Sequence, residues 1–158
     1  MSQYIFITSP MKLPELDLTN EKIITPAQAK EKNIKPPSWT TWDELGPNCE
    51  ISYFENEDDI NNLSIRRVFD FLEDLRQYTN NEFIYMITCS SDEKRAGQLL
   101  DYILNLHMKN NISIYSIWIG DNAKISPIQV LMNDLNTNIL LSILDNYNCG
   151  IVIYSGID

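Results

Sequence analysis

The sequence predicts an α+β fold in which a mixed sheet of five or six strands has amphipathic helices packed against it. Segments with strand-like and helix-like patterns alternate along most of the chain, which indicates one sheet covered by helices. The short connection between the apolar segments 112–120 and 128–132 predicts an antiparallel hairpin, and a hairpin makes the sheet mixed. Without that hairpin the same order of elements fits a parallel α/β sheet, which is the alternative.

A strand and a short helix are predicted near the N-terminus. The segment QYIFITS (3–9) alternates, is rich in β-branched and aromatic residues, and ends at a proline, so it predicts a strand. The segment 25–32 predicts a short helix, because it places Thr25 at the N-cap, Pro26 at the first helical position and Gln28 where it completes a capping box.

The middle of the chain predicts two further strands with a helix between them. The segment 41–45 repeats a Thr-x-x-Glu box, and CEISYFE (49–55) is a predicted strand. Apolar residues recur at helical spacing from 64 to 78, which predicts an amphipathic helix. Its apolar face would comprise Ile65, Val68, Phe69, Leu72 and Leu75. The continuous apolar run FIYMITC (83–89) is typical of a central strand covered on both faces.

A second helix should follow this strand. Ser90 and Glu93 form a capping box, and the apolar stripe after them predicts a helix that continues to about Met108. The segment ISIYSIWIG (112–120) carries the strongest strand pattern in the chain.

The last third of the chain predicts a strand, a helix and a final strand. Apolar and polar residues alternate over 128–132, which indicates the second arm of the hairpin. A helix over 136–147 should stop at Gly150, and IVIYS (151–155) forms the last strand.

The length predicts a single domain over 1–158. Within it, residues 10–48 hold six of the seven prolines and form an irregular acidic segment, whereas 49–158 form the main body of sheet and helices. Trp39 and Trp42 argue that the irregular segment is ordered, and ordered segments of this length are usually functional.

The charge of the chain indicates the class of partner. There are 22 acidic and 12 basic residues, for a formal charge of −10. This field repels nucleic acids and anionic lipid surfaces and attracts basic proteins, so we expect a basic protein partner, no nucleic acid and no membrane. The excess is concentrated near the N-terminus, since residues 1–62 carry eleven acids and five bases and residues 36–62 carry no base.

The cysteines and the N-terminus predict a cytoplasmic protein. Cys49, Cys89 and Cys149 are an odd number at wide spacing, which predicts buried thiols in a reducing compartment and no disulfide framework. The first residues lack the pattern of a signal peptide, and no apolar run reaches the roughly 18 residues that a membrane helix needs.

The acidic stretch YFENEDDINN (53–62) does not fit a metal site. An EF-hand loop beginning at Glu55 would have Ile60 where glycine is needed and Arg66 where glutamate is needed. Magnesium-dependent phosphoryl chemistry needs acids that converge from different elements, usually with a base nearby, and here the acids are consecutive. We therefore expect no metal site.

We expect no catalytic residues and no cofactor. His107 is the only histidine, and its place on the apolar stripe of its helix predicts a half-buried structural role. The five glycines are too far apart for a phosphate-binding loop. We therefore expect that the protein is not an enzyme. The alternative is a metal-dependent hydrolase that uses acids at strand ends, such as Glu55 or Asp92.

Aromatic side chains mixed with acids predict a protein-binding face. Interface hot spots favour tryptophan and tyrosine, and complementary charge steers the encounter. The candidate partner-binding residues are Trp39, Trp42, Asp43, Glu44, Tyr53, Glu55, Glu57, Asp58 and Asp59. In the alternative, the tryptophans are core residues, and the acids are a solvated turn whose charge supports the helix predicted from residue 64.

A small acidic domain of this architecture, without catalytic residues, resembles the immunity proteins of bacterial toxin–immunity systems, including those of contact-dependent growth inhibition. The resemblance rests on size, charge and architecture, and no residue motif carries it. It implies that the partner is a cognate toxin domain, often a basic nuclease, which the immunity protein inhibits by covering its active site or its nucleic-acid-binding face.

Overall fold

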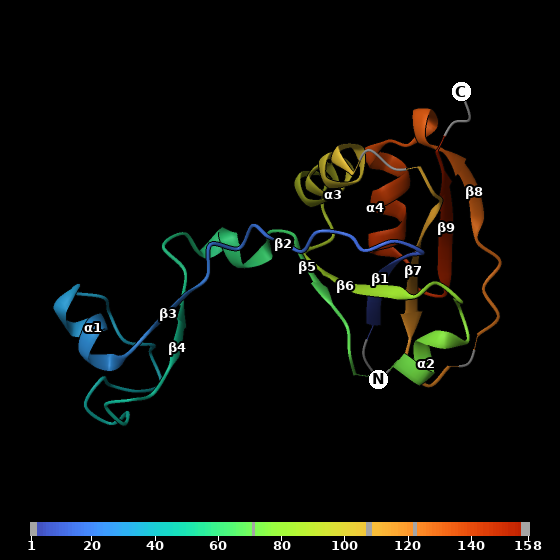
Figure 1. The fold of residues 1–158 in the computed structure, drawn as a ribbon. Helices are drawn as coiled ribbons and strands as arrows, with labels where there is room; N and C mark the ends of the chain where they lie inside the picture. Colours follow the sequence, from blue (N-terminus) through green and yellow to red (C-terminus); the bar gives the residue numbers. More distant parts are fainter. Residues whose placement is uncertain (1–2, 71, 107–108, 122, 156–158) are drawn as a thin grey trace. The chain divides into compact units, whose positions relative to one another are not determined.

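The computed structural model of the chain describes residues 3–70, 72–106, 109–121 and 123–155 (Figure 1). It contains two compact units. The sheet unit comprises residues 1–18 and 61–158, and the small unit comprises residues 19–60. The single domain over 1–158 that the length indicates stays a prediction, and it requires that the two units unfold together.

The sheet unit is built around a seven-stranded sheet in the order β2-β5-β6-β1-β7-β9-β8. Neighbouring strands are antiparallel except β8 and β9, which are parallel. The strands are β1 Gln3–Ser9, β2 Leu16–Asp17, β5 Ser64–Arg67, β6 Phe83–Thr88, β7 Ile112–Trp118, β8 Ile128–Leu131 and β9 Cys149–Tyr154. The α+β class and the mixed sheet are confirmed, whereas the prediction of five or six strands was too low because β2 and β5 were missed. The strand predicted at 49–55 exists as β4 (Ile51–Tyr53), but it lies outside this sheet.

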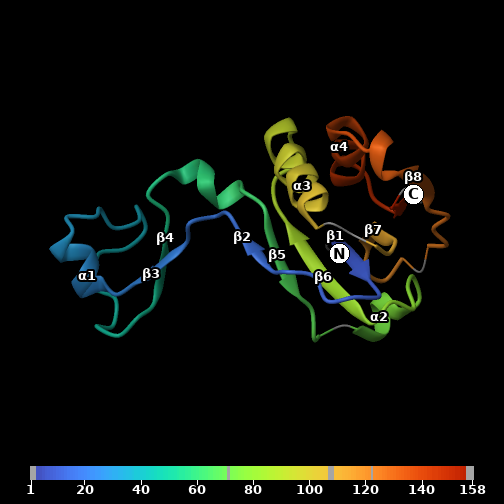
Figure 2. The same ribbon diagram turned by 45° about the horizontal axis from the view of Figure 1, so that its top comes forward.

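Helices cover both faces of this sheet. Figure 2 shows α3 (Glu93–Asn105) and α4 (Thr137–Asp145) on one face and α2 (Leu72–Arg76) on the other. The alternation of β1 divides its side chains between the two layers, so that Ile7 joins the core under α3 and α4 while Phe6 joins Leu75 and Tyr115 in the core under α2.

The helix predicted over 64–78 is wrong. Residues 64–67 form β5 instead, in which Ile65 pairs with Ile87 of β6 and is fully buried. Of the described residues in the predicted segment, 64–70 and 72–78, only 72–76 are helical. Strand pairing explains the difference, because the edge of β6 that faces away from β1 would otherwise be unpaired, and a short segment with a β-branched residue can pair with it.

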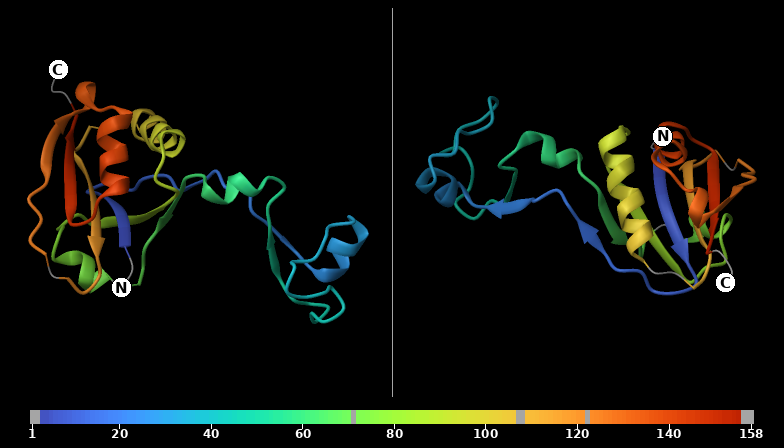
Figure 3. Two further views of the ribbon diagram at one scale, coloured as in Figure 1. Left: turned by 180° about the vertical axis from the view of Figure 1, so that it is seen from behind. Right: turned by 90° about the horizontal axis from the view of Figure 1, so that it is seen from above.

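The hairpin predicted for 112–132 is also wrong. The edge of β7 is taken by β9, in a register that pairs Ile112 with Ile153. β8 lies beyond β9 at the end of the sheet and is joined to it through α4 (Figure 3). The more apolar β9 thus takes the position that is covered on both faces, and β8 takes the edge. The alternative of an all-parallel sheet is wrong as well, since β8 and β9 are the only parallel neighbours among the described strands.

The residues predicted to begin α3 and to end α4 are also wrong. The N-cap of α3 is Asp92, which accepts a hydrogen bond from the backbone N–H of Arg95 at 3.0 Å, whereas Ser90 Oγ donates to Asn61 Oδ1. Gly150 does not stop α4 but lies inside β9, and Asn148 takes the left-handed conformation with φ of 55°. The strands at 3–9, 83–89 and 112–120 and the helix at 136–147 are confirmed within a few residues.

The small unit has its own fold. Its strands β3 (Lys22–Ile24) and β4 (Ile51–Tyr53) form an antiparallel ribbon, and α1 (Pro26–Glu31) follows β3. The capping box predicted at Thr25 is confirmed, with both of its hydrogen bonds present. The last four residues of the unit, 57–60, belong to a 3-10 helix, η1 (Glu57–Asn61). No helix in the described ranges is long and apolar enough to cross a membrane.

Candidate functional site

All nine candidate partner-binding residues lie in the small unit. Residues 19–60 carry nine acids and four bases, and all four bases precede residue 36. The candidate site therefore belongs to one compact unit and comprises aromatic side chains and acids.

Trp42 is a core residue of the small unit and not a surface contact. Its side chain is 8% exposed, and it packs with Ile24 and Ala29. The indole Nε1–H donates to the backbone carbonyl of Ile34 at 2.8 Å, so the polar end of the ring is satisfied. Tyr53 is half-buried against the same core. Both residues hold the small unit together, which is the role that the alternative interpretation gave to the tryptophans.

Trp39 is placed differently, because 77% of its surface is exposed. Two other large apolar residues of the small unit, Ile23 and Ile60, are each 56% exposed. Single exposed apolar residues are common, but an exposed tryptophan is the side chain that most often anchors a protein interface. Sequence patterns missed Ile23 and Ile60, since an isolated isoleucine gives no sign of its exposure.

The two acids of the segment 41–45 make local contacts within the small unit. The Asp43 carboxylate forms an ion pair with Lys30 of α1. Glu44 Oε2 accepts a hydrogen bond from the backbone N–H of Thr41 at 2.9 Å, which is half of the predicted capping box. The segment is a series of turns and not a helix.

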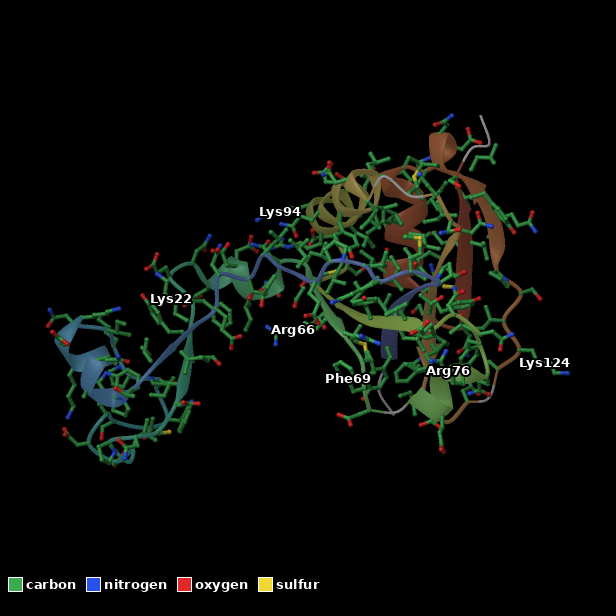
Figure 4. All side chains as sticks on the ribbon, in the orientation of Figure 1. Lys22, Arg66, Phe69, Arg76, Lys94 and Lys124 are labelled. Atoms are coloured by element: carbon green, nitrogen blue, oxygen red, sulfur yellow. The ribbon has the colours of Figure 1, made fainter. Side chains whose placement is uncertain are left out.

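Glu55 lies just after β4 and forms an ion pair with Lys22 of β3. Figure 4 labels Lys22 on the ribbon of the small unit. The hydrogen bond and the charge of Lys22 lower the pKa of the Glu55 carboxyl from its usual value. The pair is solvent-exposed, so its contribution to stability is small.

Glu57, Asp58 and Asp59 form the first turn of η1. The Asn56 side chain accepts a hydrogen bond from the backbone N–H of Asp58 at 3.2 Å, and the Asn20 side-chain amide donates to Asp59 Oδ2 at 3.2 Å. The helix that these acids were expected to support from residue 64 does not exist, so that part of the alternative is wrong. The other part, a solvated acidic turn, stays a prediction, and Glu57 and Asp58 are exposed. Their charge instead stands at the start of a five-residue 3-10 helix.

The acids named for the hydrolase alternative have structural contacts. Asp92 caps α3 and also accepts a hydrogen bond from Arg95 Nη1 at 3.2 Å, while Glu55 belongs to the other unit and pairs with Lys22. Among the residues that the structure describes, no three His, Cys, Asp or Glu side chains gather as a metal site would require. His107 lies outside the described residues.

All three cysteines are free thiols. Burial, with a smaller contribution from the charge of Asp92, raises the pKa of the Cys89 thiol from 9.0 to about 11. The reactive thiolate is then about 100-fold scarcer near neutral pH than for an ordinary cysteine.

We expect Cys89 in the folded chain to react with iodoacetamide at pH 8 about 100-fold more slowly than in the urea-unfolded chain, because the folded thiol is both protonated and half-buried. Timed quenching followed by peptide mass spectrometry measures this rate. Equal rates in the folded and unfolded chain would contradict the assignment of Cys89 as an inert thiol.

Comparisons with known proteins give no relative. No family model matches the chain, and neither a curated protein nor a solved structure is similar to it.

Proposed function

We propose that the protein is an acidic binding module that captures and inhibits a basic protein partner through its small unit. The observation that carries the proposal is the 77% exposure of Trp39 in a stretch, residues 36–60, that has seven acids and no base. An exposed tryptophan offers a large contact area at low entropic cost, and the surrounding carboxylates attract a basic surface.

The partner class follows from the charge. A protein of net charge −10 gains association rate with a basic protein, and consecutive carboxylates can occupy the positions that nucleic-acid phosphates take on a nuclease. We therefore propose a cognate toxin domain as the partner, in the manner of bacterial immunity proteins. The inhibition would be steric and electrostatic, needs no cofactor, and would take place in the cytoplasm.

The contacts within the small unit narrow the binding residues. Trp42 and Tyr53 maintain the fold of the unit, so they contribute indirectly. The residues proposed to face the partner are Trp39, Asp43, Glu44, Glu55, Glu57, Asp58 and Asp59.

The proposal is tested by affinity capture at low salt with the tagged full chain and lysate of the native host. We expect recovery of a protein rich in lysine and arginine. Capture should be lost when the six acids of the candidate set are neutralised to the corresponding amides, and should weaken at least about 10-fold in Trp39→Ala, because Trp39 anchors the contact. The control neutralises six exposed acids of the sheet unit, which changes the net charge equally: Asp70, Glu73, Asp74, Glu93, Asp101 and Asp134.

Two outcomes would contradict the proposal. Recovery of no basic protein would remove the partner class. Equal loss of capture in the two neutralised variants would show that the overall negative field binds the partner, with no role for the small unit.

A further inference from the structure

β8 is an edge strand of the seven-stranded sheet, and Pro127 directly precedes it. In the described part of the chain it pairs only with β9. Its four residues carry no charge, and Ile128 and Leu131 are 67% and 55% exposed. Edge strands are usually protected by charges, prolines or bulges within the strand. The opposite edge, β2, has only two residues, one of which is Asp17, ion-paired with Arg66.

A cavity of about 810 Å³ lies beside the C-terminal end of β8. Gln129 and Leu131 of β8 line it, as do Tyr154 of β9 and two residues that precede β7, Lys109 and Asn111. The volume falls within the range of ligand pockets in proteins. Its wall combines an apolar part with hydroxyl, amide and ammonium groups, which can bind both the side chains and the polar groups of a peptide.

The described lining of this cavity carries a charge opposite in sign to the net charge of the chain. None of the described residues that line the cavity is acidic, although the chain has 22 acids and 12 bases. A second cavity, of about 300 Å³, shares Lys109 and adds Lys12, and its described lining also contains no acid. Lys12 and Lys109 are the charged side chains among the described residues that line the two cavities, and they complement a negatively charged ligand.

The connection that carries Lys12 is fixed to the sheet unit at two points. The backbone N–H of Leu13 donates to the Tyr85 hydroxyl at 2.9 Å, and the Tyr102 hydroxyl donates to the carbonyl of Pro14 at 2.7 Å. Both tyrosines are buried. The lysine therefore stands on a held segment, which lowers the entropic cost of using it in binding.

We propose that β8 and the adjoining cavity bind an extended acidic peptide segment of a partner protein. The peptide backbone adds as a strand to the free edge of β8, an apolar side chain packs on Leu131, and a carboxylate reaches Lys109. Main-chain hydrogen bonds supply affinity in this mode of recognition, and side-chain pockets supply specificity. The site lies in the sheet unit and does not depend on the function proposed for the small unit.

A second copy of this chain fits the site less well than an acidic peptide. Pairing of β8 with β8 of another copy would bring no carboxylate within the strand to meet Lys109, because the strand is uncharged. The field of the chain, of net charge −10, also repels a second molecule of charge −10 more strongly than a short peptide with one or two carboxylates.

The test begins with a random dodecapeptide display library selected against the immobilised full chain. We expect the selected peptides to combine β-branched residues with Asp or Glu. Fluorescein-labelled copies are then titrated by fluorescence polarisation. Lys109→Glu should weaken binding at least about 10-fold, and Lys12→Glu should weaken it to a smaller extent, because each reverses a charge at the cavity.

Lys124→Glu is the matched control, since Lys124 lies between β7 and β8, points away from the sheet and lines neither cavity (Figure 4). It changes the net charge equally and should leave the affinity within about twofold. Leu131→Ser should also weaken binding, while Leu104→Ser, which alters an exposed leucine of α3, should not.

Three outcomes would overturn the proposal. The first is the absence of any enriched acidic peptide. The second is an equal effect of Lys109→Glu and Lys124→Glu, which would leave only the general field. The third is a dimer in sedimentation experiments that Leu131→Ser dissociates, which would assign the β8 edge to a second copy.

Discussion

Replacement of Trp42 by alanine is expected to unfold the small unit while the sheet unit stays folded. The small unit has three buried hydrophobic residues, Ile24, Ala29 and Trp42, and the tryptophan is by far the largest of them. Loss of a buried tryptophan costs about 3–5 kcal/mol, which exceeds what so small a core can supply. The substitution also removes the hydrogen bond to the Ile34 carbonyl.

Hydrogen exchange followed by mass spectrometry measures this effect segment by segment. In Trp42→Ala the amides of α1 and of the β3–β4 ribbon should lose protection, whereas those of β1, β6 and β7 should keep it. Trp39→Ala is the control, because that side chain is 77% exposed and its removal should change stability by less than about 0.5 kcal/mol. Loss of protection throughout the chain would show instead that the two units unfold as one.

Gly150→Ala is expected to destabilise the sheet unit by about 3 kcal/mol. A methyl group at this position would lie 2.7 Å from Tyr115 Cδ1 and 3.2 Å from the backbone carbonyl oxygen of Ile114. The ring cannot move away freely, because it stacks on Phe6 with centroids 5.3 Å apart. Overpacking of this kind costs about 1–3 kcal/mol, and the backbone contact places Gly150 at the upper end. Urea unfolding followed by circular dichroism measures the loss.

A second glycine provides the control. Gly97 lies in α3, where an added methyl group would meet no atom within 4 Å, so Gly97→Ala should stabilise the helix by up to about 1 kcal/mol. A double-mutant cycle with Tyr115→Ala identifies the clash, since the two substitutions together should cost less than the sum of their separate effects. Simple additivity would show that Gly150 is needed for another reason.

The sequence predicted an element well where its pattern agreed with its surroundings. The segments of β1, β6 and β7 are continuous or alternating apolar runs, and they occupy the middle of the sheet, where such runs are needed. The prediction for the segment of β5 was wrong because its apolar spacing also fits a helix. Pairing with β6 decides between strand and helix, and a local pattern does not show that pairing. The hairpin predicted for β8 was wrong for a related reason. The true partner of β8 is β9, which follows about twenty residues later, and local periodicity does not reveal such a pairing.

The candidate site could be predicted only as a segment. Composition located Trp39, Trp42 and the six candidate acids in one region of the sequence, and the structure places these residues in one unit. No local sequence pattern shows that Trp39 is exposed and Trp42 is buried, because Trp42 is buried by contacts with Ile24 and Ala29. The cavity beside β8 gave no sequence signal, since Lys109, Leu131 and Tyr154 meet only through the order of the strands.

The central place of β1 has a consequence for the way the chain acquires its fold during synthesis. β1 leaves the ribosome well before its two partners, β6 and β7, whose residues follow it by roughly 80 to 110 positions. Until β7 has emerged, β1 exposes at least one unpaired edge, and loop closure over such separations is slow. The nascent chain therefore passes through a long interval in which QYIFITS is open to wrong pairing, and chaperone binding to this segment would protect it.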